Sequence, residues 1–401
     1  MNVNEFAIAV ARFNANSDRA NLNCNRNPTD SNDRLGITQG SRALTMKTYR
    51  KQYEKLCSYE NLYLAYQKAR KEKTKKQYVL DFEAHLEGNL IRLQKELQTF
   101  DYKPNKLKKF IVRDPKTRTI HASAFRDRVV HHALVNILEP IFERIFIQDS
   151  YASRKNRGTH LAVNRFIYFI RKVSSNGRFV KGAWNRNSVC GYVLKADIKK
   201  YFDYVDHKIL LGIIRRKVRD EGVLWLVKVI LDNFETSKEE KDMPLGNYTS
   251  QFFANVYLNE LDYFVKHVLK AKYYIRYVDD FVILHRRKKM LEHYKDRITR
   301  YLACLEITIH PDKSDILPLR NGITFLGYRI FYHYRLLRKR NIKHFKKEFE
   351  GYLELYKEGF VTKKMLLEQL QGWFGYAQWA NTYNLRQQVL KYLESGGGER
   401  T

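Results

Sequence analysis

Apolar residues recur every three or four positions along much of the chain, which is the spacing of one face of an amphipathic helix. The first clear example follows Ser58, a suitable N-cap, and carries Leu62, Tyr63 and Tyr66 on one face. A later helix contains Pro140, where we expect a break because proline removes a backbone hydrogen bond. Helices are predicted over residues 59–73, 78–100, 127–146, 163–173, 249–270 and 290–306, and as three segments within 341–395.

Apolar runs of strand length lie between these helices. The stretch "KKFIVRDPKTRTIHASAF" predicts a β-hairpin with Asp114 and Pro115 at its turn. Two matched runs, "YYIRYV" and "FVIL", flank Asp279 and Asp280, and "GITFLGYRIFYHYRLLR" predicts another short hairpin. Hairpins set among helices indicate an α+β fold with antiparallel sheet.

Composition separates the first 45 residues from the rest. They include nine Asn within 32 positions and no Lys, and their polar, turn-forming pattern predicts a weakly ordered extension. Their charges nearly cancel, so almost all of the net charge of +31 lies beyond them. A charge of this size on a 401-residue chain with 44% hydrophobic residues indicates a globular protein with a polyanionic partner, most simply nucleic acid.

The four cysteines are far apart and form no CxxC pair, which argues against a zinc site or a disulfide framework. The start "MNVNEFAIAVARF" lacks the basic lead and apolar core of a secretion signal, and no apolar run approaches membrane-spanning length. We therefore expect a protein of the cytoplasm of a bacterium or archaeon, or of a cell infected by a phage that encodes it, with no membrane partner.

Two adjacent carboxylates, Asp279 and Asp280, lie inside an otherwise apolar stretch, where burying charge is costly without compensation. Side chains alternate along a strand, so the pair should lie at a hairpin turn. Asp197 ends another apolar run, "YVLKAD", and would join them if the strands are neighbours. Three carboxylates without His or Cys favour two Mg²⁺ ions, with Mn²⁺ as the alternative, and such ions support in-line phosphoryl transfer.

Eight short motifs follow one another through the middle of the chain: "RDPKTRTI", "FRDRVVHHAL", "SYASRKNRGTHLA", "KADIKKYFDYVDH", "PLGNYTSQFFANVYLNELD", "YVDDF", "HPDKSDI" and "GITFLGY". Their order and approximate spacing resemble those of reverse transcriptases over roughly residues 50–340. The resemblance implies a right-hand polymerase fold, with fingers and palm in 46–335 and a short, all-helical thumb in 336–401. It also implies that template RNA, an RNA–DNA duplex and deoxynucleoside triphosphates are the substrates.

The same resemblance assigns roles to individual residues. Asp197, Asp279 and Asp280 would be the catalytic metal ligands, completed by the backbone carbonyl of Ile198, and Lys313 would be a general acid. The residues implied in nucleotide binding are Lys116, Arg118, Phe202, Leu245 and Gly246, with Phe202 at the position that excludes a 2′-hydroxyl. The residues implied in template and primer binding are Arg154, Arg157, Ser250, Gln251, Gly322, Phe325, Gly327 and Tyr328, the last four in the primer-grip motif.

One departure narrows the resemblance. Retroviral-type enzymes have Gln-Gly and Ser-Pro where this chain has Leu245-Gly246 and Ser250-Gln251. An aliphatic residue there, together with the thumb-like "LQGWFGYAQWANTYNL", resembles the reverse transcriptases of diversity-generating retroelements. That family copies a template-repeat RNA with frequent errors at adenine for mutagenic retrohoming, and works with a small, basic, oligomeric accessory variability protein.

Two further interpretations remain open. The chain could serve phage defence, a retron or CRISPR adaptation, or be an RNA-binding scaffold that retains the fold without catalysis. The intact set of Asp197, Asp279 and Asp280 argues against a scaffold, since unneutralised carboxylates would repel one another. The Asn-rich start also resembles a translated template repeat, in which case Met46 would be the natural first residue; an unrelated tail is the alternative.

Overall fold

The computed structural model describes residues 47–113, 117–182, 187–234 and 240–394. The predicted extension over 1–45 lies outside these residues. The chain divides into two compact units, which we describe one at a time. The first unit comprises Met1–Gln148, Ile198–Lys270 and Ile298–Ile309, and the second comprises Asp149–Asp197, Ala271–Arg297 and His310–Thr401.

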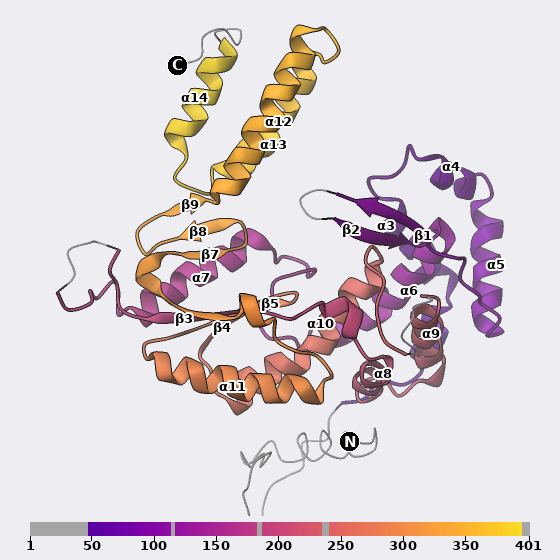
Figure 1. The fold of residues 1–401 in the computed structure, drawn as a ribbon. Coiled ribbons are helices and arrows are strands. Elements are labelled where there is room, and N and C mark those ends of the chain that lie inside the picture. Colours follow the sequence, from indigo (N-terminus) through magenta and orange to yellow (C-terminus); the bar gives the residue numbers. More distant parts are fainter. Residues whose placement is uncertain (1–46, 114–116, 183–186, 235–239, 395–401) are drawn as a thin grey trace, which may run out of the picture. The chain divides into compact units, whose positions relative to one another are not determined.

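The first unit is mainly helical (Figure 1). Ser58 caps its second described helix as predicted, because its hydroxyl accepts a hydrogen bond from the Asn61 backbone N–H at 3.2 Å. The helices are α2 (Gln52–Leu56), α3 (Tyr59–Arg70), α4 (Gln77–Glu83), α5 (Leu86–Gln98), α6 (Phe125–Phe142), α8 (His207–Arg215), α9 (Glu221–Asp232) and α10 (Tyr248–Tyr263), with the short turns η1 (Tyr201–Tyr204) and η2 (Phe264–Val268).

Two helix predictions in this unit are wrong. The single helix expected over 78–100 is two helices, α4 and α5, and the Asn89 side chain donates to the Phe82 carbonyl at 3.0 Å, which satisfies a backbone acceptor at the break. The helix expected to break at Pro140 continues through it and ends at Phe142. Because Pro140 lies in the last turn, the hydrogen bond that it removes is one of the last in the helix.

The predicted fingers hairpin is present as β1 (Lys108–Val112) and β2 (Arg118–Ala122), which pair antiparallel from Lys108 opposite Ala122 to Val112 opposite Arg118. The turn residues Asp114 and Pro115 lie outside the described residues, as does Lys116.

The second unit is built on a sheet with the strand order β4-β5-β3-β6. Its strands are β3 (Tyr192–Asp197), β4 (Tyr273–Tyr277), β5 (Asp280–His285) and β6 (Asp315–Pro318), all paired antiparallel. The helix α7 (Thr159–Val173) packs on β4 and β5 through its apolar face, which includes the buried Phe166, Phe169 and Ile170. The short turns η3 (Pro311–Lys313) and η4 (Leu319–Asn321) flank β6, and α11 (Lys288–Cys304) begins in this unit and ends in the first.

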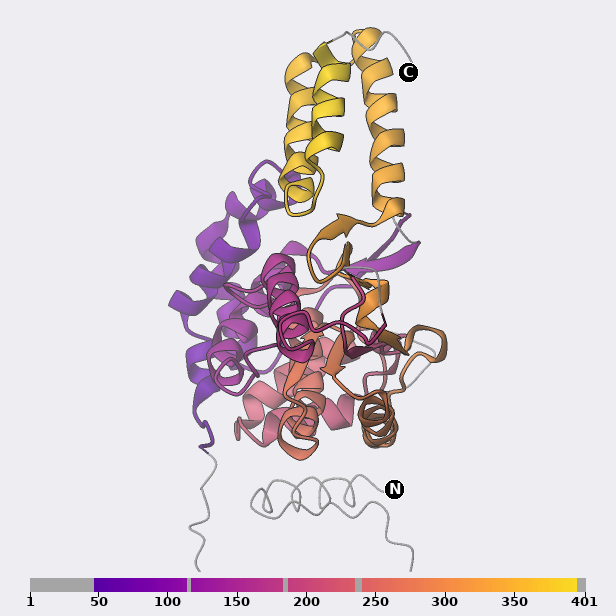
Figure 2. The same ribbon diagram turned by 90° about the vertical axis from the view of Figure 1, so that its left-hand side faces the viewer.

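The C-terminal part of the second unit starts with the predicted hairpin, β7 (Ile323–Phe325) and β8 (Tyr328–Ile330), to which β9 (Arg335–Leu337) adds a third strand that was not predicted. The three predicted helices follow as α12 (Lys339–Lys357), α13 (Lys363–Ala377) and α14 (Tyr383–Glu394), coloured from orange to yellow in Figures 1 and 2. They share a core in which Trp373 stacks on Phe345 at 3.7 Å between ring centres. None of the described helices combines the length and the apolar character that crossing a membrane requires.

Candidate active site

The two adjacent carboxylates lie where the sequence predicts a hairpin. Tyr277 at the end of β4 pairs with Asp280 at the start of β5, so Val278 and Asp279 form a two-residue turn. Val278 has a φ of 54°, which a β-branched side chain rarely adopts. The surrounding pairing therefore holds strained backbone next to the carboxylates, as is common at functional turns.

Asp197, the last residue of β3, is directly opposite Asp280 in the antiparallel pairing of β3 with β5. The two strands are therefore neighbours, as the prediction of a three-carboxylate site requires. Asp279, one residue before Asp280, brings a third acidic group to the same end of the sheet. Local patterns alone could not give this juxtaposition, because β3 and β5 are about eighty residues apart along the chain; only the motif resemblance implied it.

The site is electrostatically strained when no cation is bound. Burial, together with the neighbouring charges of Asp197 and Asp280, raises the pKa of Asp279 to about 6. Burial and Asp197 also raise the pKa of Asp280. Both shifts show that a further negative charge is costly at this end of the sheet, and a bound cation would remove that cost.

Lys313, the predicted general acid, forms an ion pair with Asp197: its ammonium lies 2.8 Å from the Asp197 carboxylate. Lys313 is the last residue of the turn η3. The backbone N–H of His310, the residue just before η3, donates to the Asp197 carbonyl at 2.7 Å. Ser314 adds a hydrogen bond from the Asp197 N–H to its hydroxyl at 3.4 Å. Asp197 is thus fixed through backbone and side chain together.

Arg276 is a positioning residue that the sequence analysis missed. Its side chain is completely buried, and its guanidinium donates to the Val278 carbonyl at 3.1 Å, inside the strained turn. An arginine in the middle of the apolar run "YYIRYV" was the available signal, since a buried guanidinium needs acceptors.

The predicted nucleotide-binding residues of the first unit lie on touching segments. The His121 N–H of β2 donates to the Leu245 carbonyl at 2.8 Å. Gly246 has a φ of 113°, and a Cβ there would come within 2.5 Å of Ile120, so a glycine is required for this close approach. Arg118 begins the same β2 strand and is exposed.

Phe202 belongs to the same region of the first unit. It lies in η1, is half-buried, and its carbonyl accepts from the Met243 N–H at 2.8 Å. Its neighbour Tyr201 is the buried ring of the pair. Ile198, the predicted carbonyl ligand, is buried and bridges to Ile309.

The residues predicted to bind template and primer differ in exposure. Arg154 and Arg157 are half-buried and engaged within the second unit, Arg154 with the Ser150 carbonyl and Arg157 above the Tyr151 ring. In α10 of the first unit, Ser250 is buried and Gln251 is exposed.

The primer-grip residues form a tight hairpin. Phe325 pairs with Tyr328 across a turn made by Leu326 and Gly327, both with positive φ. The Phe325 and Tyr328 side chains are buried in the core of the second unit, so only the backbone and the turn are left for a ligand. The Tyr376 hydroxyl of α13 donates to the Gly327 carbonyl at 2.9 Å, and Gly322 turns the chain before β7 with a φ of 68°.

The donor chemistry of the hairpin fits a hard divalent cation, since carboxylate oxygens are the ligands that Mg²⁺ and Mn²⁺ prefer. Among the described residues, no three acidic, His or Cys side chains are gathered closely enough to enclose an ion as they stand. The Asp197 carboxylate is instead paired with the Lys313 ammonium. Asp197, Asp279 and Asp280 would therefore have to turn toward a metal when it binds.

A protein-family model described as "Reverse transcriptase (RNA-dependent DNA polymerase)" matches residues 105–330, which is more than half of the chain. The match includes Asp197, Asp279, Asp280 and Lys313.

The individual relatives have low sequence identity with this chain. Protein YkfC of Escherichia coli K12 is 26% identical over 301 residues, covering 65% of this chain and 74% of that protein. The group II intron-encoded protein LtrA of Lactococcus lactis is 29% identical over 196 residues, covering 47% of this chain and 30% of LtrA. The nuclear intron maturase 1 of Arabidopsis thaliana is 33% identical over 104 residues, 12% of its length. A solved structure of apo telomerase from Candida tropicalis matches with a TM-score of 0.42 and 13% identity, over 57% of this chain and 48% of that one, a likeness too loose to carry weight.

Proposed function

Because the chain belongs to the reverse transcriptase (RNA-dependent DNA polymerase) family, we propose that it polymerises DNA on an RNA template at the Asp279 hairpin. The single observation that carries this proposal is the register that places Asp197 opposite Asp280, next to Asp279. We assign residues 46–335 to fingers and palm and 336–401 to the thumb.

In the proposed reaction, Asp197, Asp279 and Asp280 would hold two Mg²⁺ ions, which would supply activation of a 3′-hydroxyl and neutralisation of the leaving pyrophosphate. The cations of the fingers hairpin, Arg118 and Lys116, bind the triphosphate. Lys313 would release Asp197 and donate a proton from Nζ to the pyrophosphate, a role open to a positioned ammonium group.

Primer extension tests the proposal directly. The full chain is incubated with an RNA template, an annealed DNA primer, the four deoxynucleotides and Mg²⁺, and we expect extension that stops when the metal is chelated. The absence of metal-dependent extension, in the presence of RNA binding, would favour a non-catalytic scaffold instead.

Metal binding should also be visible in thermal unfolding without any substrate. Because the pKa of Asp279 is raised from 3.8 to about 6 in the folded protein, its ionisation destabilises the fold. This destabilisation is absent below pH 3.8, grows between 3.8 and 6, and is complete above 6. At pH 7.5 we expect Mg²⁺ to raise the melting temperature of the wild type by a few degrees, and by much less at pH 5.

Asp279→Asn removes the titrating group and should make the melting temperature less sensitive to both pH and Mg²⁺. Asp312→Asn is the matched control, since the Asp312 side chain of the same unit is 86% exposed and should leave both responses unchanged. Equal responses of the wild type and the Asp279 variant would argue against a metal at this carboxylate.

Within the family, we propose the diversity-generating role. The enzyme would copy a template-repeat RNA with errors at adenine for mutagenic retrohoming, assisted by a small, basic, oligomeric variability protein. Leu245 supports this proposal, because it puts an aliphatic side chain where a glutamine would offer a polar contact to the nascent base pair. The other template and primer residues, from Arg154 to Tyr328, would then guide the RNA–DNA duplex.

Leu245→Gln tests that role. Its carbonyl already holds β2 through the His121 N–H, a contact that the substitution leaves in place, so the fold should be retained. We expect the error frequency opposite template adenines to fall several-fold while errors at the other bases change little, as measured by sequencing the cDNA. Wild-type errors spread evenly over the four template bases would favour a different bacterial reverse transcriptase, such as one in phage defence, a retron or CRISPR adaptation.

A further inference from the structure

A hollow of about 380 Å³ lies in the second unit, on the face of α7 that points away from the sheet. The apolar residues of α7, such as Phe166, are buried against β4 and β5. Its opposite face presents Asn164, Tyr168 and Arg171, which follow one another at intervals of four and three residues and line the hollow. None of these residues belongs to the predicted polymerase site.

The opposite wall is the loop between β8 and β9, residues 331–334, in which every residue is aromatic. The Phe331 N–H donates to the Tyr334 carbonyl at 2.8 Å, and the two rings stack with centres 4.8 Å apart. Tyr332 fits against Gly177, where a Cβ would lie 2.8 Å from its ring. The loop is therefore held in shape before any ligand arrives, which lowers the entropy cost of binding.

The charge of the hollow is positive and uncompensated. Arg335 is half-buried, donates to the Asn164 side chain at 3.2 Å, and lies over the Trp379 ring. Burial lowers the pKa of Arg335, and the part of the chain that the structure describes offers neither Arg335 nor Arg171 an acidic partner. An arginine kept half-buried without a carboxylate costs solvation free energy that an anionic ligand would offset.

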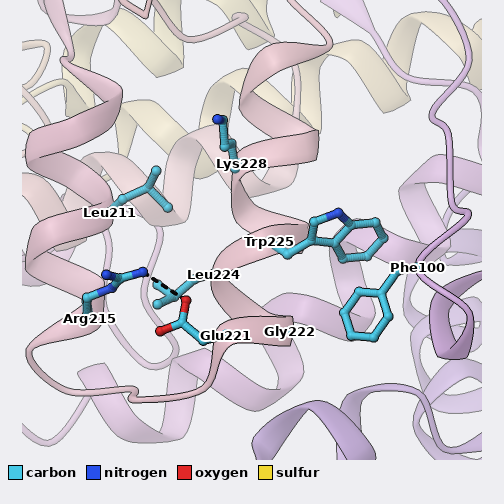
Figure 3. Close-up of a pocket in the computed structure, with 8 residues that line it drawn as sticks. All are labelled: Phe100, Leu211, Arg215, Glu221, Gly222, Leu224, Trp225 and Lys228. Atoms are coloured by element: carbon cyan, nitrogen blue, oxygen red, sulfur yellow. Dashed lines mark hydrogen bonds and ion pairs between the residues drawn. The ribbon is translucent and has the colours of Figure 1, made fainter.

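A second hollow, between α8 and α9 in the first unit, differs from the hollow beside α7 in the side chains that line it (Figure 3). It has a similar volume, about 400 Å³, and is lined by Phe100 and Trp225. Its Arg215, however, is paired with Glu221 at 2.9 Å, as the dashed line in Figure 3 shows. Lys228 adds a positive charge to this hollow, but Glu221 adds a negative one and none of the described residues that line it has a side-chain amide, so its lining is less suited to a nucleotide than that of the hollow beside α7.

We propose that the hollow beside α7 binds one unpaired nucleotide of single-stranded RNA, outside the polymerase site. The base would stack on Tyr168, the amides of Asn164 and Asn381 would face its edge, and Arg171 would meet its phosphate. Aromatic rings, amides and arginines without an acidic partner, gathered in one hollow of nucleotide size, are the groups by which proteins hold splayed-out bases. The inference rests on the proposed function only in taking RNA as the substrate class.

Binding is tested with the full chain and a short single-stranded RNA whose 3′ end is blocked, in the presence of EDTA and without nucleotides. Tyr168→Ala should weaken the affinity about tenfold, which corresponds to the loss of one stacked base. Arg171→Ala should lower the slope of affinity against salt by about 0.7, which corresponds to one phosphate contact on a single strand.

Two controls separate the hollow from the rest of the surface. Leu161→Ala removes an exposed side chain of the same helix that does not line the hollow, and Lys289→Ala removes one exposed cation elsewhere in the unit. The first should bind as the wild type, and the second should change the affinity less than Arg171→Ala. Melting temperatures of all variants show whether each one is folded.

Photo-crosslinking gives a readout that a merely structural role would not produce. With 4-thiouridine in the RNA, we expect cross-linked peptides from 159–171 or 328–335, and their loss in Tyr168→Ala. Wild-type affinity in Tyr168→Ala together with cross-links confined to other segments would overturn the proposal. If the wild type does not extend a primer but the variants still lose RNA binding, the polymerase proposal fails and this one stands.

Discussion

Asp279→Asn is expected to lower deoxynucleotide incorporation at least about a thousandfold, which corresponds to about 4 kcal/mol of transition-state stabilisation. Asparagine keeps the size of the side chain and one oxygen, but it lacks the negative charge that a metal requires. The variant should fold, because removing a carboxylate whose pKa is raised relieves repulsion from Asp197 and Asp280. Single-nucleotide incorporation with saturating template and primer measures the loss in kcat.

The same assay separates a chemical role from a binding role. Asp279→Asn should bind the primer–template as tightly as the wild type, whereas Asp312→Asn, which changes an exposed carboxylate of the same unit, should retain full incorporation. Asp197→Asn should cause a loss of similar size, and the double variant little more, since the proposed mechanism has the carboxylates hold the metals as a unit. Incorporation by Asp279→Asn at more than a tenth of the wild-type rate would contradict the assignment.

The position of the acidic hairpin was predictable because its signals are local. Two apolar runs of strand length flank Asp279 and Asp280, and alternation of side chains excludes a regular strand through both. The structure has that hairpin, and the α+β polymerase fold implied by the motif order is confirmed by the family match. The cap at Ser58 was predictable for the same reason, as its hydrogen bond spans only three residues.

Helix ends and contacts between distant segments were not predictable. Nothing in the run around Pro140 shows that α6 ends two residues beyond it, so the proline could not be placed in the last turn rather than at a break. The split between α4 and α5 is stabilised by a side chain, Asn89, that bonds back across it. Likewise, the hollow beside α7 is lined by residues of three separate segments: α7, the run 331–335, and Asn381. Only the fold brings these segments together.

Residues that match the same motif also differ in how far their side chains are exposed to solvent. Phe325 and Tyr328 match the primer-grip motif, but their side chains fill the core, so the Leu326 and Gly327 turn is the part that can reach a ligand. Tyr201 and Phe202 are adjacent aromatics, and only Tyr201 is fully buried. A motif thus marks a segment, and burial decides which atoms of the segment are available.

Phe202→Ala is expected to increase incorporation of ribonucleotides relative to deoxynucleotides about a hundredfold. A pocket that excludes a hydroxyl by shape alone discriminates by about this factor, and removing the ring removes the exclusion. The position of Phe202 is well fixed: its carbonyl accepts from the Met243 N–H, and the hydroxyl of its neighbour Tyr201 donates to the Ala254 carbonyl at 3.0 Å. The backbone should therefore keep its course when the ring is lost.

The measurement is the ratio of kcat/KM for a ribonucleotide and the matching deoxynucleotide on one RNA template. Phe202→Tyr is the matched variant, because it keeps a ring at the same place and should preserve selection against the 2′-hydroxyl. In Phe202→Ala, the deoxynucleotide kcat/KM should change by less than about tenfold, since the ring is assigned to exclusion and not to metal or triphosphate binding. An unchanged ratio in a folded Phe202→Ala variant would show instead that Phe202 only packs beside Tyr201, where the ring centres are 5.3 Å apart.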